Sequence, residues 1–185
     1  YHRTGHQLTL ELGAGGDSDN LVAPSFFGNR LTFDTGLSFA LAGGYAYRFN
    51  PWAAFGVSAH YSLMSATVEG AAQSDDEAFW VTASFGFTGY PLWFTRFDPY
   101  VGLYVGYSLW TVPAEIGGSR RNYRLHGVTL QLKLGMNVYV TRFLSVGPVF
   151  RYFFPFWIRY CITGVGDHCE PIEDLGAVSS TTEDS

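Results

Sequence analysis

The sequence predicts an all-β fold, an antiparallel up-and-down transmembrane β-barrel to which this chain contributes seven strands. One observation is that seven segments alternate large apolar residues with small or polar ones, at the period of two of a strand rather than the 3.6 of a helix. A second is that 47% of the residues are hydrophobic, yet no apolar run approaches the roughly 18 residues of a transmembrane helix. Because backbone groups in lipid have no water to bond, a sheet that spans a membrane has to close on itself.

Each of the seven segments reaches the roughly 9 to 11 residues that a tilted strand needs to cross a bilayer. In chain order they are His6 to Gly15, Leu37 to Asn50, Ala53 to Thr67, Ala78 to Tyr90, Tyr100 to Val112, Leu125 to Val140 and Leu144 to Tyr160. Their large faces include, in the same order, Leu8 and Leu10; Leu37 and Phe39; Phe55 and Val57; Phe85 and Phe87; Leu103 and Val105; Leu130 and Leu132; and Phe150 and Tyr152. The opposite faces are mostly Gly, Ala, Ser and Thr, with Ser58, Gly86 and Lys133 among them. We expect the large faces to contact lipid and the small faces to line a narrow interior.

The connections between these segments alternate in length. Short connections are expected at 50–52, 94–99 and 141–143, and longer ones at 17–36, 70–77, 113–124 and from Cys161 onward. All tight turns therefore fall at one end of the barrel and all long loops at the other, as in outer-membrane barrels with periplasmic turns and external loops. Pro148 and Pro155 remove ladder donors from the last segment, which predicts a bulge or a barrel seam there.

Aromatic residues gather near the ends of the segments. Trp52, Trp93, Tyr100 and Tyr139 lie by the short turns, and Trp110 and Trp157 lie toward the long loops. They are candidates for the interfacial girdles of a membrane barrel, where amphipathic rings lie at headgroup depth. Aromatic residues that cap a soluble sheet are the alternative interpretation.

A soluble, lipocalin-like barrel would show the same alternation turned inside out. Its water-facing surface would need many Lys, Glu and Asp, whereas the small faces here carry few charges. The chain forms one domain over residues 1–185, with no linker that would divide it. Six acids and no Lys or Arg follow Arg159, so the other 10 acids nearly balance the 11 bases. The acidic tail is expected to be a solvated external loop at about 161–185, and no basic patch indicates nucleic acid.

The two cysteines, Cys161 and Cys169, lie eight positions apart in that last loop. In an oxidising compartment we expect them to form a disulfide. Two free thiols are the alternative, and a zinc site has less support because His168 is the one imidazole nearby and zinc takes four ligands. No cofactor is predicted.

Over essentially the whole chain, this pattern of alternating segments and loops resembles the small outer-membrane β-barrel family of OmpA-like and OmpX-like eight-stranded proteins. The resemblance implies an eighth strand that closes onto the first. An open sheet would leave unpaired edges in lipid, at several kcal/mol for each unsatisfied backbone group. We expect the eighth strand to come from sequence that continues past Ser185 or from another protein chain.

The predicted interior holds a few large polar side chains: Glu11, Arg48, His60, Gln131, Lys133 and Arg151. We expect a charge network of Glu11, Arg48, His60, Lys133 and Arg151 that fills the lumen, with Glu11 bound to Arg151 or Lys133, because a buried unpaired ion is costly. A gated conduction path is the alternative. A hydrolase set of Ser58, His60 and Ser62 is disfavoured because a packed interior gives substrate no access.

The sequence therefore predicts a non-enzymatic protein of the bacterial outer membrane with a structural or interaction role through its external loops. Its expected partners are outer-membrane lipid and a second protein, which either supplies the eighth strand or binds the loops. A small-solute transporter or narrow channel is the first alternative. The second alternative, implied by the resemblance, is a lipid-modifying enzyme with its catalytic groups near the outer rim, where His126 is the nearest imidazole.

Overall fold

A computed structural model describes residues 4–15, 21–22, 32–68, 77–91, 97–116, 119–141, 144–164 and 168–172. This part of the chain is all-β. Eight antiparallel strands follow one another in chain order across an up-and-down sheet: β1 (Gly5–Gly15), β3 (Thr32–Asn50), β4 (Ala53–Val68), β5 (Ala78–Gly89), β6 (Phe97–Ile116), β7 (Ser119–Tyr139), β9 (Val149–Thr163) and β10 (His168–Pro171). Two short strands, β2 (Leu21–Val22) and β8 (Ser145–Val146), pair with β3 and β7. Among the described residues, no helix is long and apolar enough to cross a membrane.

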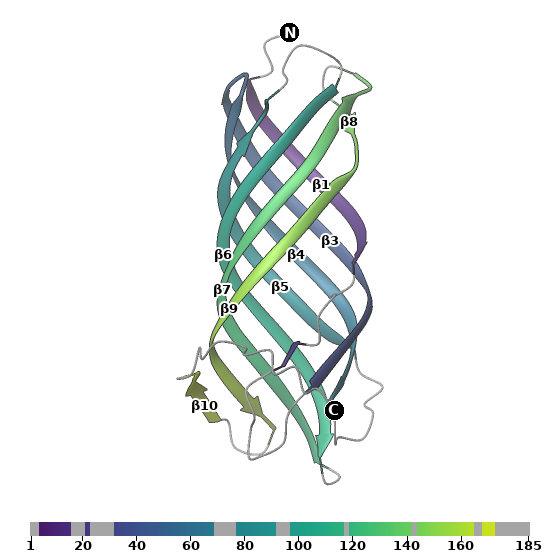
Figure 1. The fold of residues 1–185 in the computed structure, drawn as a ribbon, viewed down its shortest axis with the longest axis vertical. Coiled ribbons are helices and arrows are strands. Elements are labelled where there is room, and N and C mark those ends of the chain that lie inside the picture. The colour runs from purple at the N-terminus through teal and green to yellow at the C-terminus, as the bar shows by residue number, and fades with distance from the viewer. Residues whose placement is uncertain are drawn as a thin grey trace, which may run out of the picture.

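The strands are strongly tilted and wind around a common long axis, so that the sheet curls into a tall, incomplete cylinder (Figure 1). The seven long strands correspond to the seven predicted segments, and their alternation explains why they form strands. β3, β6 and β7 extend beyond the predicted bounds, and the predicted segment from Leu144 to Tyr160 is divided into β8 and β9. The sheet is not closed by backbone pairing. Within the described residues, β1 pairs with β3 alone, and the outer edge of β9 pairs with β10 over its last few residues only.

An eighth strand is present where the sequence predicted only a loop. His168–Pro171 forms β10, in which Cys169 lies opposite Cys161 of β9. The segment has no alternating pattern, and its pairing is instead held by the disulfide between these cysteines. It therefore could not be recognised from side-chain periodicity.

The connection between β6 and β7 is much shorter than the loop predicted at 113–124. These strands pair continuously up to Ile116 and Ser119, so Pro113 lies within the hairpin opposite Asn122. The sequence signal for this hairpin is the pair Gly117 and Gly118, because two glycines between strands favour a tight turn.

The outward face carries an unbroken apolar row across all seven long strands. Direct cross-strand pairing connects Leu8, Tyr45, Val57, Phe85, Val105, Leu130 and Phe154. Leu8 is 86% exposed and Phe85 is 54% exposed. The inward face is polar and buried, as at Thr82, Ser108 and Thr129. This arrangement is the reverse of a water-soluble protein, in which large apolar side chains are the ones removed from solvent.

The strands are also staggered around the cylinder. Residues that pair directly on neighbouring strands form a row that starts at Gly5 on β1. The row passes through Arg48 on β3 and Lys133 on β7 and ends at Arg151 on β9. Arg151 nevertheless contacts Glu11, which lies six residues beyond Gly5 on β1 (11 − 5 = 6). A barrel needs such an offset, because tilted strands must be shifted in register before the first and last can meet.

Candidate functional site

The interior contains two separate charge clusters, and the first is centred on Glu11 of β1. Lys133 of β7 donates from Nζ to Glu11 Oε1 at 2.6 Å, and Arg151 of β9 donates from Nε to Oε2 at 2.8 Å. The three side chains are between 8% and 13% exposed. The predicted contact between Glu11 and the two cations is thus present. It joins β1 to β7 and β9 through side chains, across a gap that no backbone pairing bridges in the described part of the chain.

The single carboxylate of Glu11 cannot neutralise both Lys133 and Arg151. The ammonium group of Lys133 also lies over an aromatic ring. Lys133 Nζ lies 5.5 Å from the ring centroid of Tyr100. A cation over a ring face is attracted to the negative potential of the π system. Tyr100 therefore faces inward, and its predicted place in a lipid-facing girdle is wrong. Gly135, which pairs with Tyr100, leaves the space that the Tyr100 ring occupies, because a Cβ at position 135 would overlap the ring.

The second cluster lies near the β3–β4 turn and is centred on Arg48. Arg48 Nη1 donates to Asp98 Oδ2 at 2.5 Å, and Nη2 donates to the Pro51 carbonyl. The guanidinium lies 3.6 Å from the ring centroid of Tyr90. Tyr139 donates from its hydroxyl to Asp98 at 3.4 Å. Arg48 and Asp98 are both 0% exposed, so this ion pair is completely withdrawn from solvent.

This arrangement corrects three predictions. Arg48 does not belong to one network with Glu11, because it has its own carboxylate partner. Tyr139 faces inward to that carboxylate rather than outward as a girdle residue. Asp98 lies in the connection predicted at 94–99, whereas β6 already begins at Phe97. The alternation itself contained the signal, since Asp98 shares the inward parity of Gly102 and Tyr104.

His60 is buried inside the sheet as predicted, but it contacts aromatic rings rather than the charge clusters. Its ring lies 4.7 Å from that of Phe153 and 6.3 Å from that of Trp80, measured between centroids. No hydrogen bond or ion pair joins His60 to Glu11 in the part of the chain that the structure describes. His60 therefore takes part in the predicted charge network only through electrostatic interactions with Arg151 and Glu11, while its direct contacts are aromatic.

Rows of hydroxyl groups occupy the interior on the long-loop side of the Glu11 cluster, because on β7 Gln131 and Thr129 follow Lys133 away from Tyr139. Ser58 bonds Ser84 at 2.9 Å, and Ser84 donates to Gln131 at 3.3 Å. A second row runs from Thr82 through Ser108 to Thr129, at 2.7 and 2.5 Å. Each hydroxyl can donate and accept, so such rows satisfy polar groups that lack water. Ser58 is hydrogen-bonded to Ser84, and no contact in the described residues joins it to His60, which would have to act as its general base.

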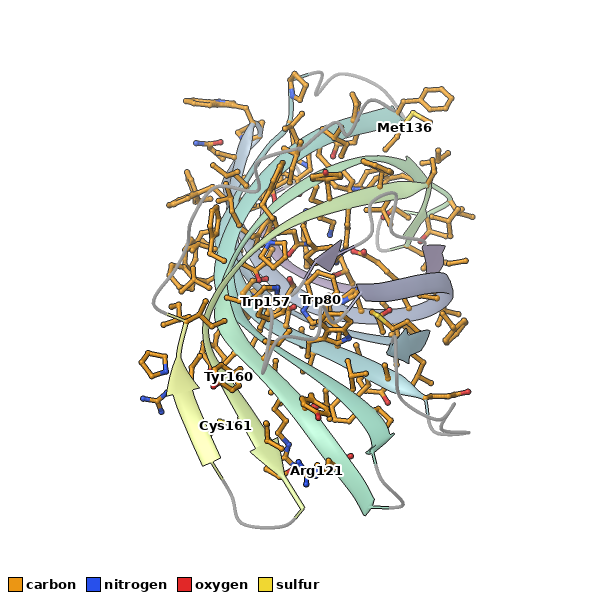
Figure 2. The ribbon with its side chains drawn as sticks, turned by 60° about the horizontal axis from the view of Figure 1, so that its bottom comes forward. Trp80, Arg121, Met136, Trp157, Tyr160 and Cys161 are labelled. Atoms are coloured by element: carbon orange, nitrogen blue, oxygen red, sulfur yellow. A yellow bond between two sulfur atoms is a disulfide. The ribbon has the colours of Figure 1, made fainter. Side chains whose placement is uncertain are left out.

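Three tryptophans gather inside the sheet at the long-loop end, and one pair of them, Trp110 and Trp157, is stacked. The ring of Trp157 lies 6.4 Å from that of Trp80 and 6.1 Å from that of Trp110, and Figure 2 shows Trp80 and Trp157 together within the curve of the strands. Trp110 is 3% exposed and belongs to the apolar core with Leu125 and Tyr160. The predicted girdle positions of Trp110 and Trp157 are therefore wrong, because both share the inward parity of their strands. Trp52 is 62% exposed at the β3–β4 turn, and Trp93 lies outside the described residues.

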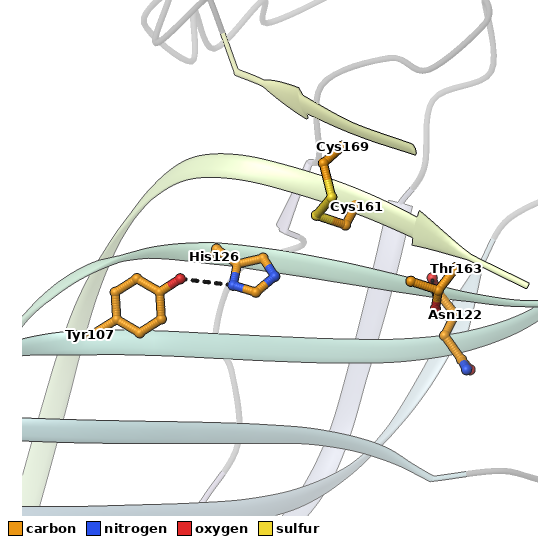
Figure 3. The surroundings of a disulfide bond; sticks show 6 residues. All are labelled: Tyr107, Asn122, His126, Cys161, Thr163 and Cys169. Carbon is orange, nitrogen blue, oxygen red and sulfur yellow. Dashed lines mark hydrogen bonds between the residues drawn. A yellow bond between two sulfur atoms is a disulfide. The ribbon is translucent and has the colours of Figure 1, made fainter. Parts of the chain in front are cut away.

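Cys161 and Cys169 form the predicted disulfide, with an S–S distance of 2.06 Å (Figure 3). It joins β9 to β10 at the long-loop end. On the neighbouring strands, the Tyr107 hydroxyl and His126 Nδ1 are hydrogen-bonded at 2.8 Å on the outward face. Among the described residues, no group of three or more His, Cys, Asp or Glu side chains gathers in a way that could hold a metal ion. Comparison of the chain with protein-family models, curated proteins and solved structures finds no match.

Proposed function

We propose that this protein is an integral β-barrel of a bacterial outer membrane, with its long loops external and its short turns periplasmic. The single observation that carries the proposal is the inverted distribution of side chains, with large apolar residues outside and polar residues inside. In water this exposed apolar surface would be far larger than the few hundred Å² that soluble monomers tolerate. In lipid the same surface is favourable, because the bilayer core is itself apolar.

The length of the apolar face supports a bilayer rather than a protein partner. On β7 the outward residues from Val128 to Val138 are all apolar, a span of 11 residues (138 − 128 + 1). A tilted strand crosses a bilayer in about 9 to 11 residues. The face is continuous around the curled sheet, whereas a protein partner would be expected to cover one side.

We further propose that an eighth long strand fills the gap between β1 and β9 and closes the barrel. Both edges carry unpaired backbone groups over the described residues, which in lipid would be costly. β10 already runs antiparallel to β9 along this edge, and the next amide, Ile172 N, donates to the Ile158 carbonyl at 2.9 Å. The direction of β10 favours closure by this polypeptide rather than by a second chain.

The role that fits this interior is structural, with interactions through the external loops. Side chains occupy the interior at the Arg48 cluster, at the Glu11 cluster and, further toward the long loops, at the hydroxyl rows. A narrow channel remains the second candidate, favoured by the excess of cations at the Glu11 cluster. No described residues assemble a nucleophile with a base, so enzymatic lipid modification has no support from the geometry.

Reconstitution tests this proposal. The purified protein is refolded into phosphatidylcholine vesicles. We expect it to float with the vesicles after an alkaline carbonate wash, and planar-bilayer recordings to show no steady conductance. Recovery in the soluble fraction would contradict membrane insertion. Stable ion-conducting steps would contradict the filled lumen and favour the channel.

A further inference from the structure

The outward face of the sheet carries a cluster of basic residues where its apolar band ends. On β7 the outward positions Val128 to Val138 are apolar, and the next two toward the long loops are His126 and Arg124. On β9 Arg159 pairs directly with His126. We call Arg124, His126 and Arg159 the basic patch. Arg124 and Arg159 are exposed and His126 is half-buried.

A β-bulge places Arg159 in this patch. The register of β7 and β9 shifts between His126 and Gly127, so that Gly127 pairs with Trp157 and His126 with Arg159, leaving Ile158 unpaired with β7. Arg151 and Trp157 face inward at odd positions of β9, and without the bulge Arg159 would do the same. A bulge is a recurrent means of redirecting a side chain next to a functional position.

Neither arginine has an ion-pair partner among the residues that the structure describes; the described salt bridges involve Glu11 and Asp98, which lie inside the sheet. On β10, Pro171 lies opposite Arg159, while Glu170 pairs with Tyr160. Tyr107 bonds His126 Nδ1 and fixes the orientation of the imidazole. Arg124 and Arg159 are therefore two cations that the described part of the protein leaves uncompensated. They are bordered by the outward-facing side chains of Ile158 and Phe156, which are 53% and 52% exposed.

We propose that the basic patch binds the phosphate group of a membrane lipid, with Arg124 and Arg159 as the phosphate ligands and the lipid chains along Ile158 and Phe156. The inference rests on the proposed membrane insertion, which puts the end of the apolar band at headgroup depth. Guanidinium groups match phosphate oxygens in a forked geometry. Charges at this depth cost little, whereas the same charges at the bilayer centre would be strongly destabilising.

Native mass spectrometry of the folded protein in a neutral detergent tests the patch, with phosphatidic acid as the probe and diacylglycerol as the same lipid without phosphate. The test variant is R124Q/R159Q. The matched control is R96Q/R142Q, which removes two arginines that the sequence places in the connections at the opposite end of the strands. At about 1 kcal/mol for each arginine near an anionic surface, we expect the test variant to lose about 30-fold in phosphatidic acid affinity. The control is expected to bind as the wild type does.

Three results would overturn the inference: equal phosphatidic acid binding by the test and control variants, equal binding of diacylglycerol and phosphatidic acid by the wild type, or displacement of phosphatidic acid by equimolar inorganic phosphate. The last would show that the patch takes a free anion. Failure of the wild type to enter vesicles contradicts the proposed function alone, because the detergent assay measures the patch independently. Melting of both variants within a few degrees of the wild type confirms that the comparison is between folded proteins.

Discussion

Glu11 on β1 and Arg151 on β9 are in contact at 2.8 Å, although no backbone hydrogen bond joins their strands in the described residues. Their ion pair, together with Lys133, holds the two open edges of the sheet at a fixed offset. A long strand that closes the barrel would have to run past this cluster with a small or polar residue facing it. The cluster is therefore both a filler of the interior and a determinant of register at the seam.

Replacing Glu11 by Ala leaves Lys133 and Arg151 facing each other in a poorly hydrated interior. Removal of one partner from a buried pair costs about 3 to 5 kcal/mol, and less where water enters. The change in the free energy of unfolding is measured by urea titration of the protein in vesicles. Thr9→Ala, on the same strand outside the cluster, is the control. If Glu11→Ala lowers the free energy of unfolding by less than Thr9→Ala does, the lumen is well hydrated around Glu11.

The Arg48 cluster is expected to be the more sensitive of the two, because both ions are fully withdrawn from solvent. Asp98→Asn keeps the shape and removes the charge, so we expect a loss of about 3 to 5 kcal/mol in the free energy of unfolding. The double variant Arg48→Met, Asp98→Leu removes the unpaired charge and is expected to recover most of that stability. If the double variant is no more stable than Asp98→Asn, the pair is not isolated from other charges as described.

Tryptophan quenching separates the interior from the surface. Trp52 is exposed at the β3–β4 turn, whereas Trp110 is buried inside the sheet. Lipids brominated near the headgroup are expected to quench Trp52 and to leave Trp110 unaffected. The contribution of each is obtained from Trp52→Phe and Trp110→Phe by difference. Equal quenching of Trp52 and Trp110 would show that Trp110 faces lipid at headgroup depth, as a girdle residue does.

The disulfide is expected to stabilise the β9–β10 hairpin locally. Closing a loop with a sequence separation of eight is worth about 2.5 kcal/mol in chain entropy. Hydrogen exchange of the Ile172 amide, which donates to Ile158, should accelerate about 10-fold or more on reduction, while amides at the centre of β5 should not change. No change at Ile172 would mean that β10 is held by other contacts.

The sequence predicted most of the fold because strand periodicity survives throughout the seven long strands. Lys133, Gly86 and Ser58 lie inward, and Phe39, Leu103 and Phe150 lie outward, as alternation requires; the side chain of Leu37 lies outside the described residues. The predictions that fail rest on proximity to a strand end rather than on parity. Tyr100 and Trp110 lie near strand ends, as girdle residues do, but both share the inward parity of Tyr104.

Other features had no usable signal in the pattern. The pairing of Arg48 with Asp98 depends on strand tilt, which alternation does not report. The bulge that turns Arg159 outward is a register shift that only the pairing of β7 with β9 reveals. β10 forms beside a disulfide and has no periodicity of its own. Tilt, bulges and crosslinks are properties of the assembled sheet, so a single strand read alone cannot predict them.

The central claim is that the large apolar face of the sheet contacts lipid, and a nitroxide scan along β4 tests it most directly. Single cysteines at Phe55, Gly56, Val57, Ser58, Ala59 and His60 are spin-labelled in a Cys161→Ser, Cys169→Ser background, with the protein in vesicles. We predict that accessibility to oxygen, which concentrates in lipid, alternates with a period of two and is highest at Phe55, Val57 and Ala59. Alternation with maxima at Gly56, Ser58 and His60, or high accessibility to a water-soluble nickel complex at Val57, would contradict the account.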